Sequence, residues 1–287
     1  MSKPLTVRSV RDEETDDVLA FVRSRGVAPL ARTTWDGLGM AGYVGVLGSG
    51  DDEEIVAVLP IEPREVFLAD GRVARVLHQV GVYVDEGQRR QGLATLLQGQ
   101  VLNIARQLGA AAVTAYAAHE RAYQWYGHSE MFPELAIDRF ELDGADAGVG
   151  GEPAAVVEAV EDVPAAAGQV RRPLGAWAEV HPRALVGSIV TAYADAGKAV
   201  LGIDGGAAEV LAWEADDGAS LIDAVRALAG RRGWRLGWSA SDNDPLHDAL
   251  AAAGTTGGVA ARRHLMVRPV ADSVDTSGWR FRAFDEL

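Results

Sequence analysis

Apolar and polar positions predict the same order of elements twice along the chain. In the first half, alternating apolar residues predict strands, and apolar residues at helical spacing predict the helices between them. The predicted strands are Leu5–Val10, Tyr43–Leu47, Ile55–Leu59 interrupted by Pro60 and Pro63 before Val66–Leu68, Val73–Val84, Ala111–Tyr116 and Ala136–Leu142. The predicted helices are Glu13–Arg23, Gly92–Leu108 with Gly109 as its cap, and one that starts at His119.

A stretch rich in glycine and alanine, Asp143–Ala155, follows and has the composition of a linker. After it, the predicted helices are Val186–Ala196, Ser220–Ala229 and Pro245–Ala253, and the predicted strands are Ala199–Ile203, Ala208–Ala215, Trp234–Ser239 and Arg262–Val267. The second half therefore repeats the order of elements in the first half: hairpin, helix, strand, helix, strand. This predicts the α/β (α+β) class, with two domains of mixed, mostly antiparallel sheet flanked by helices. The expected boundaries are 1–145, a linker at 146–155, and 156–287.

Composition narrows the chemistry. The 287 residues include no cysteine, which excludes disulfides, thiolate metal sites and cysteine nucleophiles. The chain has no signal-peptide core and no apolar run of roughly 20 residues, so we predict a soluble cytoplasmic protein. The net charge of −14 argues against nucleic-acid or membrane partners. An acidic surface would attract a cationic amine substrate, although many proteins are acidic simply because the charge keeps them soluble. His119 and His128 have no metal-ligand spacing, and no metal is expected.

The most informative stretch is VGVYVDEGQRRQGLATLL, residues Val80–Leu97. A predicted strand ends at Val84, and a glycine-containing turn leads directly into a helix. Free backbone N–H groups and the helix dipole make such a turn an anion cradle, and Gly92 lets a phosphate approach the backbone. Arg89 and Arg90 can add charge-assisted hydrogen bonds. A glycine alone at this junction would be a weak signal.

The full pattern resembles the pyrophosphate-binding signature of the GNAT superfamily of N-acetyltransferases. Arg89, Gly92 and Ala94 fill its conserved positions, and Glu86 stands where the family usually has proline. The resemblance implies that acetyl-CoA, or another acyl-CoA, is the cosubstrate. It further implies a sheet that splays beside the cofactor's pantetheine arm. The residues expected to bind the cofactor are Val82, Tyr83, Val84, Arg89, Arg90, Gln91, Gly92, Leu93 and Ala94.

The resemblance extends to HERAYQWY, residues His119–Tyr126. In the family, the last tyrosine of this helix protonates the sulfur as CoA leaves, which implies that Tyr126 is the acid. His119 replaces the usual asparagine, and Tyr123 is a rival for the role. Packing of both tyrosines in the core is the simpler alternative.

A base must accept the proton of the attacking amine. His78 is the first candidate because strand alternation puts it on one face with Val80, Val82 and Val84. A buried structural histidine is the alternative. Other candidates are Glu62 and Glu65, which are more simply explained as solvated carboxylates beside Pro63, and the C-terminal carboxylate of Leu287, which related two-domain enzymes use.

The second half lacks the loop and has Asp216-Asp217-Gly218 at the equivalent turn. The chain thus resembles the enhanced-intracellular-survival acetyltransferases without their sterol-carrier domain, with an active first GNAT half and a degenerate second half that shapes the substrate cleft. We expect transfer of an acetyl group to the primary amine of a small molecule. Other acyl-CoA chemistry, such as decarboxylation, and a non-catalytic acyl-CoA sensor are alternatives. The amine, the acyl length and any homo-oligomer stay open.

Overall fold

The computed structural model describes residues 4–25, 32–37, 39–67, 73–117, 119–143, 156–160, 188–242, 244–254 and 259–270. The chain divides into two compact units. Of the described residues, the first unit contains those up to Glu65, those from Ala74 to Pro133 and those from Leu265 onward, and the second contains the rest. Each unit therefore includes residues from both halves of the sequence. The predicted linker, residues 146–155, lies outside the described residues, and the predicted domain boundary stays a prediction.

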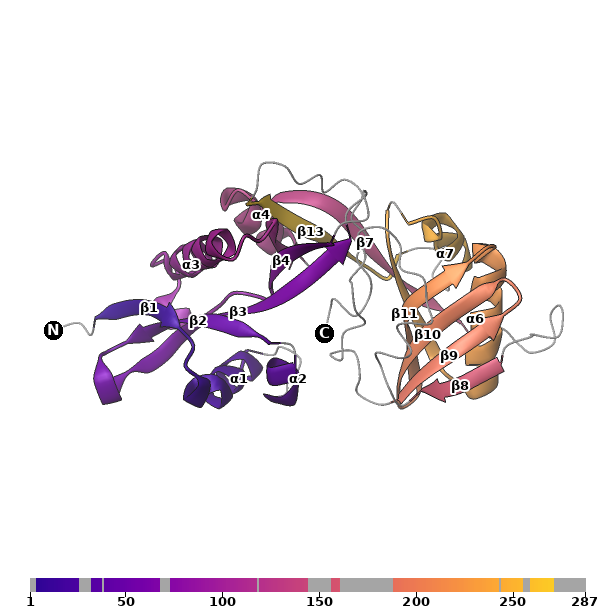
Figure 1. The fold of residues 1–287 in the computed structure, drawn as a ribbon, viewed down its shortest axis with the longest axis horizontal. Coiled ribbons are helices and arrows are strands. Elements are labelled where there is room, and N and C mark those ends of the chain that lie inside the picture. The colour runs from indigo at the N-terminus through magenta and orange to yellow at the C-terminus, as the bar shows by residue number, and fades with distance from the viewer. Residues whose placement is uncertain are drawn as a thin grey trace. The chain divides into compact units, whose positions relative to one another are not determined.

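The first unit is a mixed sheet with helices on both faces (Figure 1). Its strands are β1 (Leu5–Ser9), β2 (Ala41–Leu47), β3 (Glu54–Phe67), β4 (Val73–Gln79), β5 (Tyr83–Val84), β6 (Ala112–Ala117) and the end of β13 (Ala261–Pro269). Its helices are η1 (Asp12–Glu14), α1 (Thr15–Arg23), α2 (Arg32–Gly37), η2 (Gly50–Asp52), η3 (Glu86–Gln88), α3 (Leu93–Gln107) and α4 (Glu120–His128). The strand order is β1-β2-β3-β4-β6-β13, antiparallel between β1, β2 and β3 and parallel between β4 and β6.

Strand alternation gives this sheet a separate apolar core on each face. Leu97 and Val101 of α3 pack with Leu59 and Val113 on one face, in a cluster that also contains Tyr126 of α4. On the other face, Val18 and Val22 of α1 pack with Val44, Val46 and Val58. Successive residues of β3, β4 and β6 therefore point into different environments, and this alternation decides which side chains can meet.

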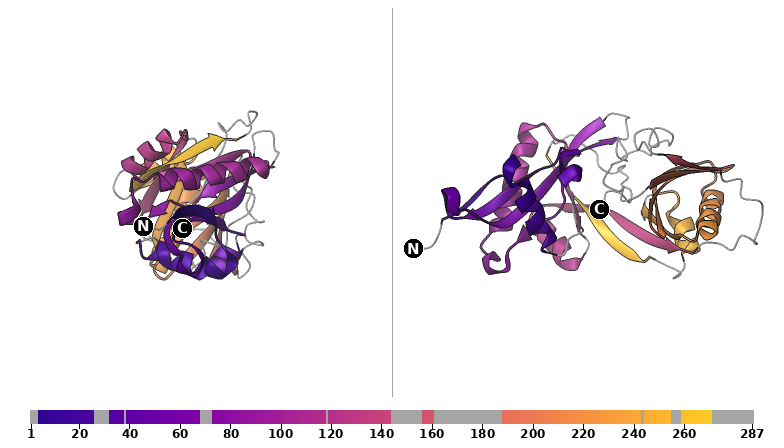
Figure 2. Two further views of the ribbon diagram at one scale, coloured as in Figure 1. Left: turned by 90° about the vertical axis from the view of Figure 1, so that its left-hand side faces the viewer. Right: turned by 90° about the horizontal axis from the view of Figure 1, so that it is seen from below.

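In the described part of the chain, the second unit has six further strands and two helices. They are β7 (Phe132–Leu142), β8 (Val156–Val160), β9 (Ser188–Ala194), β10 (Gly197–Asp204), β11 (Ala207–Ala215), β12 (Arg235–Ser241), α6 (Gly218–Arg232) and α7 (His247–Ala253). The order is β7-β12-β11-β10-β9-β8, and β11 and β12 run parallel. Figure 2 shows α6 against one face of these strands, where Leu221 and Val225 join Phe140 and Trp238 in the core. No helix in the described part of the chain is long and apolar enough to cross a membrane.

A predicted helix and a predicted strand interruption differ from the structure. Val186–Ala196 is not a helix, because Ser188–Ala194 forms β9 and pairs along its length with β10. Its apolar residues meet the helical spacing by coincidence, and the β-branched run Ile189–Thr191 favours a strand. The interrupted strand is continuous as β3. Pro60 is tolerated because it lacks its own N–H donor but its carbonyl still accepts from the Val80 N–H at 3.1 Å.

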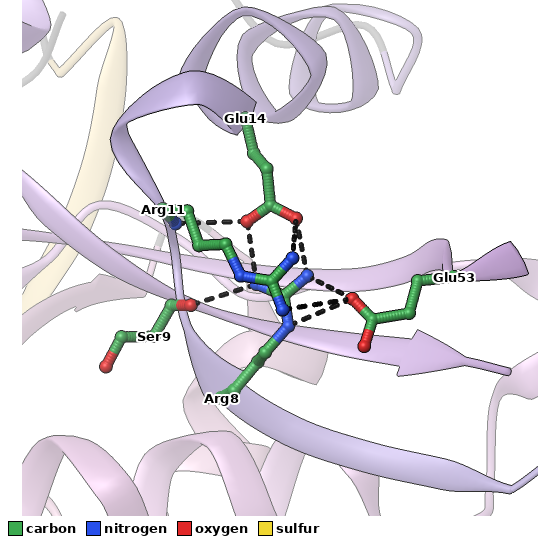
Figure 3. A network of polar contacts seen from close by, with 5 residues as sticks. All are labelled: Arg8, Ser9, Arg11, Glu14 and Glu53. Atoms are coloured by element: carbon green, nitrogen blue, oxygen red, sulfur yellow. Dashed lines mark hydrogen bonds and ion pairs between the residues drawn. The ribbon is translucent and has the colours of Figure 1, made fainter. Parts of the chain in front are cut away.

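A polar cluster ties the N-terminal strand to the β2–β3 hairpin (Figure 3). Arg8 of β1 donates to Glu14 in η1 at 2.7 Å and to Glu53 at 2.6 Å, and Arg11 lies within 3.5 Å of Glu53. The hydrogen bond with Arg8 holds the pKa of Glu14 below its ordinary value. Arg8 therefore joins two segments that are 45 residues apart in sequence.

Replacing Arg8 with methionine should lower the melting temperature at neutral pH. A carboxyl whose pKa is lowered by folding stabilises the fold above its unfolded pKa and loses that contribution as pH falls through the folded value. The difference in melting temperature between wild type and Arg8→Met should therefore shrink below about pH 4, where glutamate protonates. Calorimetric melting across pH 3–8 measures this, and a constant difference would contradict the electrostatic role.

Candidate active site

The loop before α3 has a backbone shaped for an anion. Arg90 and Gly92 both adopt left-handed conformations, with φ of 65° and 78°. Gly92 is the N-cap of α3, and no side chain in the described residues caps this helix end. The first helical bond runs from Leu96 N to Gly92 O at 3.0 Å, so the preceding amides of the first turn have no partner within the helix. These amides and the helix dipole are suited to an anion.

The side chains of the loop are arranged around this turn. Arg89 is half-exposed and donates through Nε to the Val84 carbonyl at 3.3 Å. Arg90, Gln91 and Gly92 are exposed. Leu93 instead is buried in the core and anchors the start of α3. The loop thus presents two arginines and a glycine at the surface, while Leu93 is fixed in the core.

The equivalent helix of the second unit is capped by its own sequence. Asp217 is the N-cap of α6, and its carboxylate accepts from the amides of Ala219 at 3.1 Å and Ser220 at 3.3 Å. The Ser220 hydroxyl donates to the same carboxylate at 2.6 Å and, with these amides, lowers the pKa of Asp217. Both α3 and α6 contain 15 residues, but only α3 has an N-terminus left open.

We expect the chain to bind one CoA, not two. In the second unit, the Asp217 carboxylate occupies the position where a phosphate would bind and would repel it. At about 4 Å, such a pair costs about 4 kcal/mol at an effective dielectric of 20. Titration calorimetry should give a stoichiometry near one for wild type. A value near two would overturn this expectation.

The sheet opens directly before the loop. The parallel register of β4 and β6 runs from Val76 opposite Ala112 to Gln79 opposite Ala115. Beyond Gln79 the chain leaves β6, and β5 pairs with β3 alone in the described part of the sheet. The predicted strand Val73–Val84 is therefore two strands, β4 and β5. The break falls at Gly81, where an added Cβ would collide with the Tyr83 hydroxyl oxygen. We call this opening between β5 and β6 the split.

The break also changes which face the predicted cofactor residues occupy. Val82 and Val84 pack with the α3 cluster, whereas Val80 and Tyr83 pack with the α1 cluster. The predicted common face for His78, Val80, Val82 and Val84 is wrong, because an irregular segment cannot keep a period of two. Residues from both faces therefore border the split.

Tyr126 and Tyr123 differ in their surroundings. Tyr126 is 5 % exposed, and its ring lies edge-on to Trp125 at 4.9 Å. Burial, with a smaller contribution from Tyr83, raises the pKa of the Tyr126 hydroxyl. Tyr123 is only partly buried against the same cluster. His119, which stands in place of the family's asparagine, caps α4 by accepting from Ala122 N at 3.1 Å. Helix α4 therefore fixes Tyr126 in the core, on the α3 face of the sheet.

His78 belongs to a row of buried polar side chains on the opposite, α1 face. It is 2 % exposed, and its Nδ1 lies 2.9 Å from the Thr114 hydroxyl of β6. Its ring lies 5.0 Å from that of Tyr116. The Val80–Pro60 hydrogen bond sets the antiparallel register of β3 and β4, and two residues further this register brings Glu62 opposite His78.

Glu62 is not a solvated carboxylate as predicted. It is fully buried and forms an ion pair at 2.9 Å with Arg64, which is 3 % exposed. Alternation along a strand puts residues i and i+2 on one face, and Glu-Pro-Arg with opposite charges could have signalled this pair. The side chain of Glu65 and the terminal Leu287 lie outside the described residues. Neither Arg64 nor Thr114 belongs to a recognisable motif, so the amino-acid sequence alone does not indicate either residue.

Comparison with known proteins agrees with this geometry. A model of the acetyltransferase (GNAT) family matches residues 13–129. The match includes the loop, the split, His78 and Tyr126, and this part of the chain is similar to GNAT acetyltransferases. No curated protein sequence matches the chain.

Solved structures extend the GNAT likeness to the second unit. A GCN5-related N-acetyltransferase from Kribbella flavida is 21 % identical, with 93 % of this chain and 71 % of that chain covered and a TM-score of 0.66. A tandem GNAT protein from the clavulanic acid biosynthesis pathway is 15 % identical, with 94 % and 100 % covered and a TM-score of 0.59. Eis1 from Mycobacterium abscessus is 14 % identical, with 93 % and 74 % covered and a TM-score of 0.56. The tandem GNAT fold thus spans both halves, while the family match ends at residue 129.

Proposed function

We propose that the protein transfers an acetyl group from acetyl-CoA to the primary amine of a small molecule. The observation that carries this proposal is the open N-terminus of α3, where left-handed Gly92 and uncapped amides face the surface beside Arg89 and Arg90. The family of this domain uses the same turn for the pyrophosphate of CoA. The self-capped α6 supports a single cofactor site in the first unit.

Direct transfer is the mechanism we favour. The chain has no cysteine to carry an acyl group, so the amine would attack the thioester itself. The amine nitrogen forms a bond to the carbonyl carbon, and the C–S bond breaks to give an amide and the CoA thiolate. Tyr126 would give its phenolic proton to the sulfur. His78 would accept the proton that the nitrogen loses. Tyr126 and His78 lie on opposite faces of the sheet, which suits a donor and an acceptor that act on two sides of one reacting centre.

Release of free CoA tests the function. Because the protein contains no cysteine, a thiol-reactive dye reports only CoA, without background from the enzyme. We expect release to depend on a primary amine and the mass of that amine to increase by one acetyl group. Amine-independent release of carbon dioxide from a carboxyacyl-CoA would favour decarboxylation instead. Tight acetyl-CoA binding without turnover across a broad amine panel would favour a sensor.

His78→Ala should remove the acidic limb of the kcat/KM profile. A histidine base is inactive when protonated, so wild-type activity should fall towards acidic pH. His128→Ala is the matched control, because His128 is exposed on α4 and its Nδ1 lies 2.6 Å from the Gln124 carbonyl. If His78→Ala kept the same acidic limb in its kcat/KM profile, the general base would instead be Glu62, Glu65 or the terminal carboxylate.

A further inference from the structure

Gln79 is a buried amide that has no hydrogen-bond partner among the described residues. The residue is 1 % exposed, and neither its side-chain oxygen nor its nitrogen forms a hydrogen bond with any described residue. A buried polar group in this state costs free energy comparable to a lost hydrogen bond, so such groups call for an explanation.

The position of Gln79 in the sheet explains why its amide has no partner. It is the last residue of β4, opposite Ala115, at the closed end of the split where β4 and β6 stop pairing. Alternation along β4 puts its side chain on the face of Leu77, which is the face of the cluster that also contains Ala115 and Tyr126. Gln79 and Tyr126 therefore lie on the same face of the sheet, whereas His78 belongs to the other face.

The chemistry of acyl-CoA indicates which part of the cofactor would meet Gln79. The pantetheine arm is an extended chain with the pyrophosphate at one end and the thioester at the other. The proposed pyrophosphate loop, 89–94, lies at the open end of the split, beyond β5, and Gln79 lies at the closed end. An arm that starts at the loop and follows β5 back towards β4 brings its thioester to Gln79. A carboxamide N–H is a suitable donor for a carbonyl oxygen.

We propose that the Gln79 side-chain N–H donates a hydrogen bond to the thioester carbonyl oxygen and so positions the acyl group for attack. This inference rests on the proposed acyl-CoA function and assigns to that site a residue outside the family's loop motif. Gln79 would discriminate acyl-CoA from free CoA, because only the acylated form carries this carbonyl. The same hydrogen bond would strengthen as negative charge develops on the oxygen during attack.

Gln79→Met tests the inference, because methionine fills a similar volume but has no N–H donor. Titration calorimetry with acetyl-CoA and with CoA should show the Kd of acetyl-CoA increased about 3- to 10-fold, the range for one hydrogen bond, and the Kd of CoA changed less than twofold. The turnover number should fall by about 100-fold, as for loss of an oxyanion donor. The melting temperature without ligand should be equal to or above that of wild type, because an unsatisfied buried amide has been removed.

The matched control is Gln98→Met. Gln98 is a second buried glutamine of this unit, at 3 % exposed, but its amide donates to the Met131 sulfur at 3.2 Å. This variant should keep the wild-type ratio of the two affinities. An unchanged ratio in Gln79→Met, or equal weakening of both ligands, would overturn the assignment to the thioester. Gln79→Leu provides a second apolar variant for the same ratio. Failure of wild type to bind CoA at all would instead overturn the proposed function, and this inference with it.

Discussion

Replacing Gly92 with aspartate should weaken CoA binding by about 1,000-fold. The side chain would place a carboxylate at the open N-terminus of α3, where it would bind the free amides as Asp217 does in α6. It would also face the incoming pyrophosphate, and repulsion of about 4 kcal/mol at about 4 Å corresponds to that factor in Kd. No atom of the described residues lies within 4 Å of a Cβ at Gly92, so steric damage within the protein is not the cause.

Gly109→Asp is the matched control for this variant. Gly109 follows the other end of α3 and has a left-handed φ of 64°, and a Cβ added there would have no atom of the described residues within 4 Å. Both variants add one negative charge and the same left-handed strain, which aspartate tolerates better than most residues. Titration calorimetry should show near wild-type CoA affinity for Gly109→Asp. Equal affinity in the two variants would mean that the loop does not bind the pyrophosphate.

The loop and its helix could be predicted because their signals are local. A glycine turn before an amphipathic run predicts α3 within one residue, and Gly109 has the expected left-handed conformation. The self-cap of α6 is equally local, since Asp217 and the amides it accepts from lie within three residues. Such features depend on short-range backbone chemistry, which the sequence alone contains.

The surroundings of the proposed base depend on pairing between distant strands. Glu62, His78 and Thr114 come together only through the register of β3, β4 and β6, and no local pattern sets that register. Gln79 could not be predicted either, because its proposed role depends on its being the last residue of β4 that pairs with β6. The helix predicted at Val186–Ala196 is wrong for a related reason. The sequence fits both a helical and a strand periodicity there, and pairing of Ser188–Ala194 with β10 selects the strand.

Changing Tyr126 to phenylalanine should lower turnover by about 100- to 10,000-fold, the usual contribution of a positioned acid, while CoA affinity changes little. Burial raises the pKa of this hydroxyl, which keeps the phenol protonated at neutral pH, as a donor must be. The same shift makes it a weaker acid, so proton transfer should accompany C–S cleavage rather than precede it. Phenylalanine preserves the ring that packs in the α3 cluster, and the melting temperature should not fall.

Tyr123→Phe separates this role from its rival on the same helix face. Tyr123 lies three residues earlier in α4 and is only partly buried, so loss of its hydroxyl should leave turnover within a few-fold of wild type. Single-turnover measurements with saturating acetyl-CoA separate the chemical step from binding in both variants. A large loss in Tyr123→Phe with a normal rate in Tyr126→Phe would move the acid by one helical turn. Normal rates in both would leave protonation of the thiolate to solvent, because a sulfur anion with an ordinary thiol pKa of about 8.5 can depart without a protein acid.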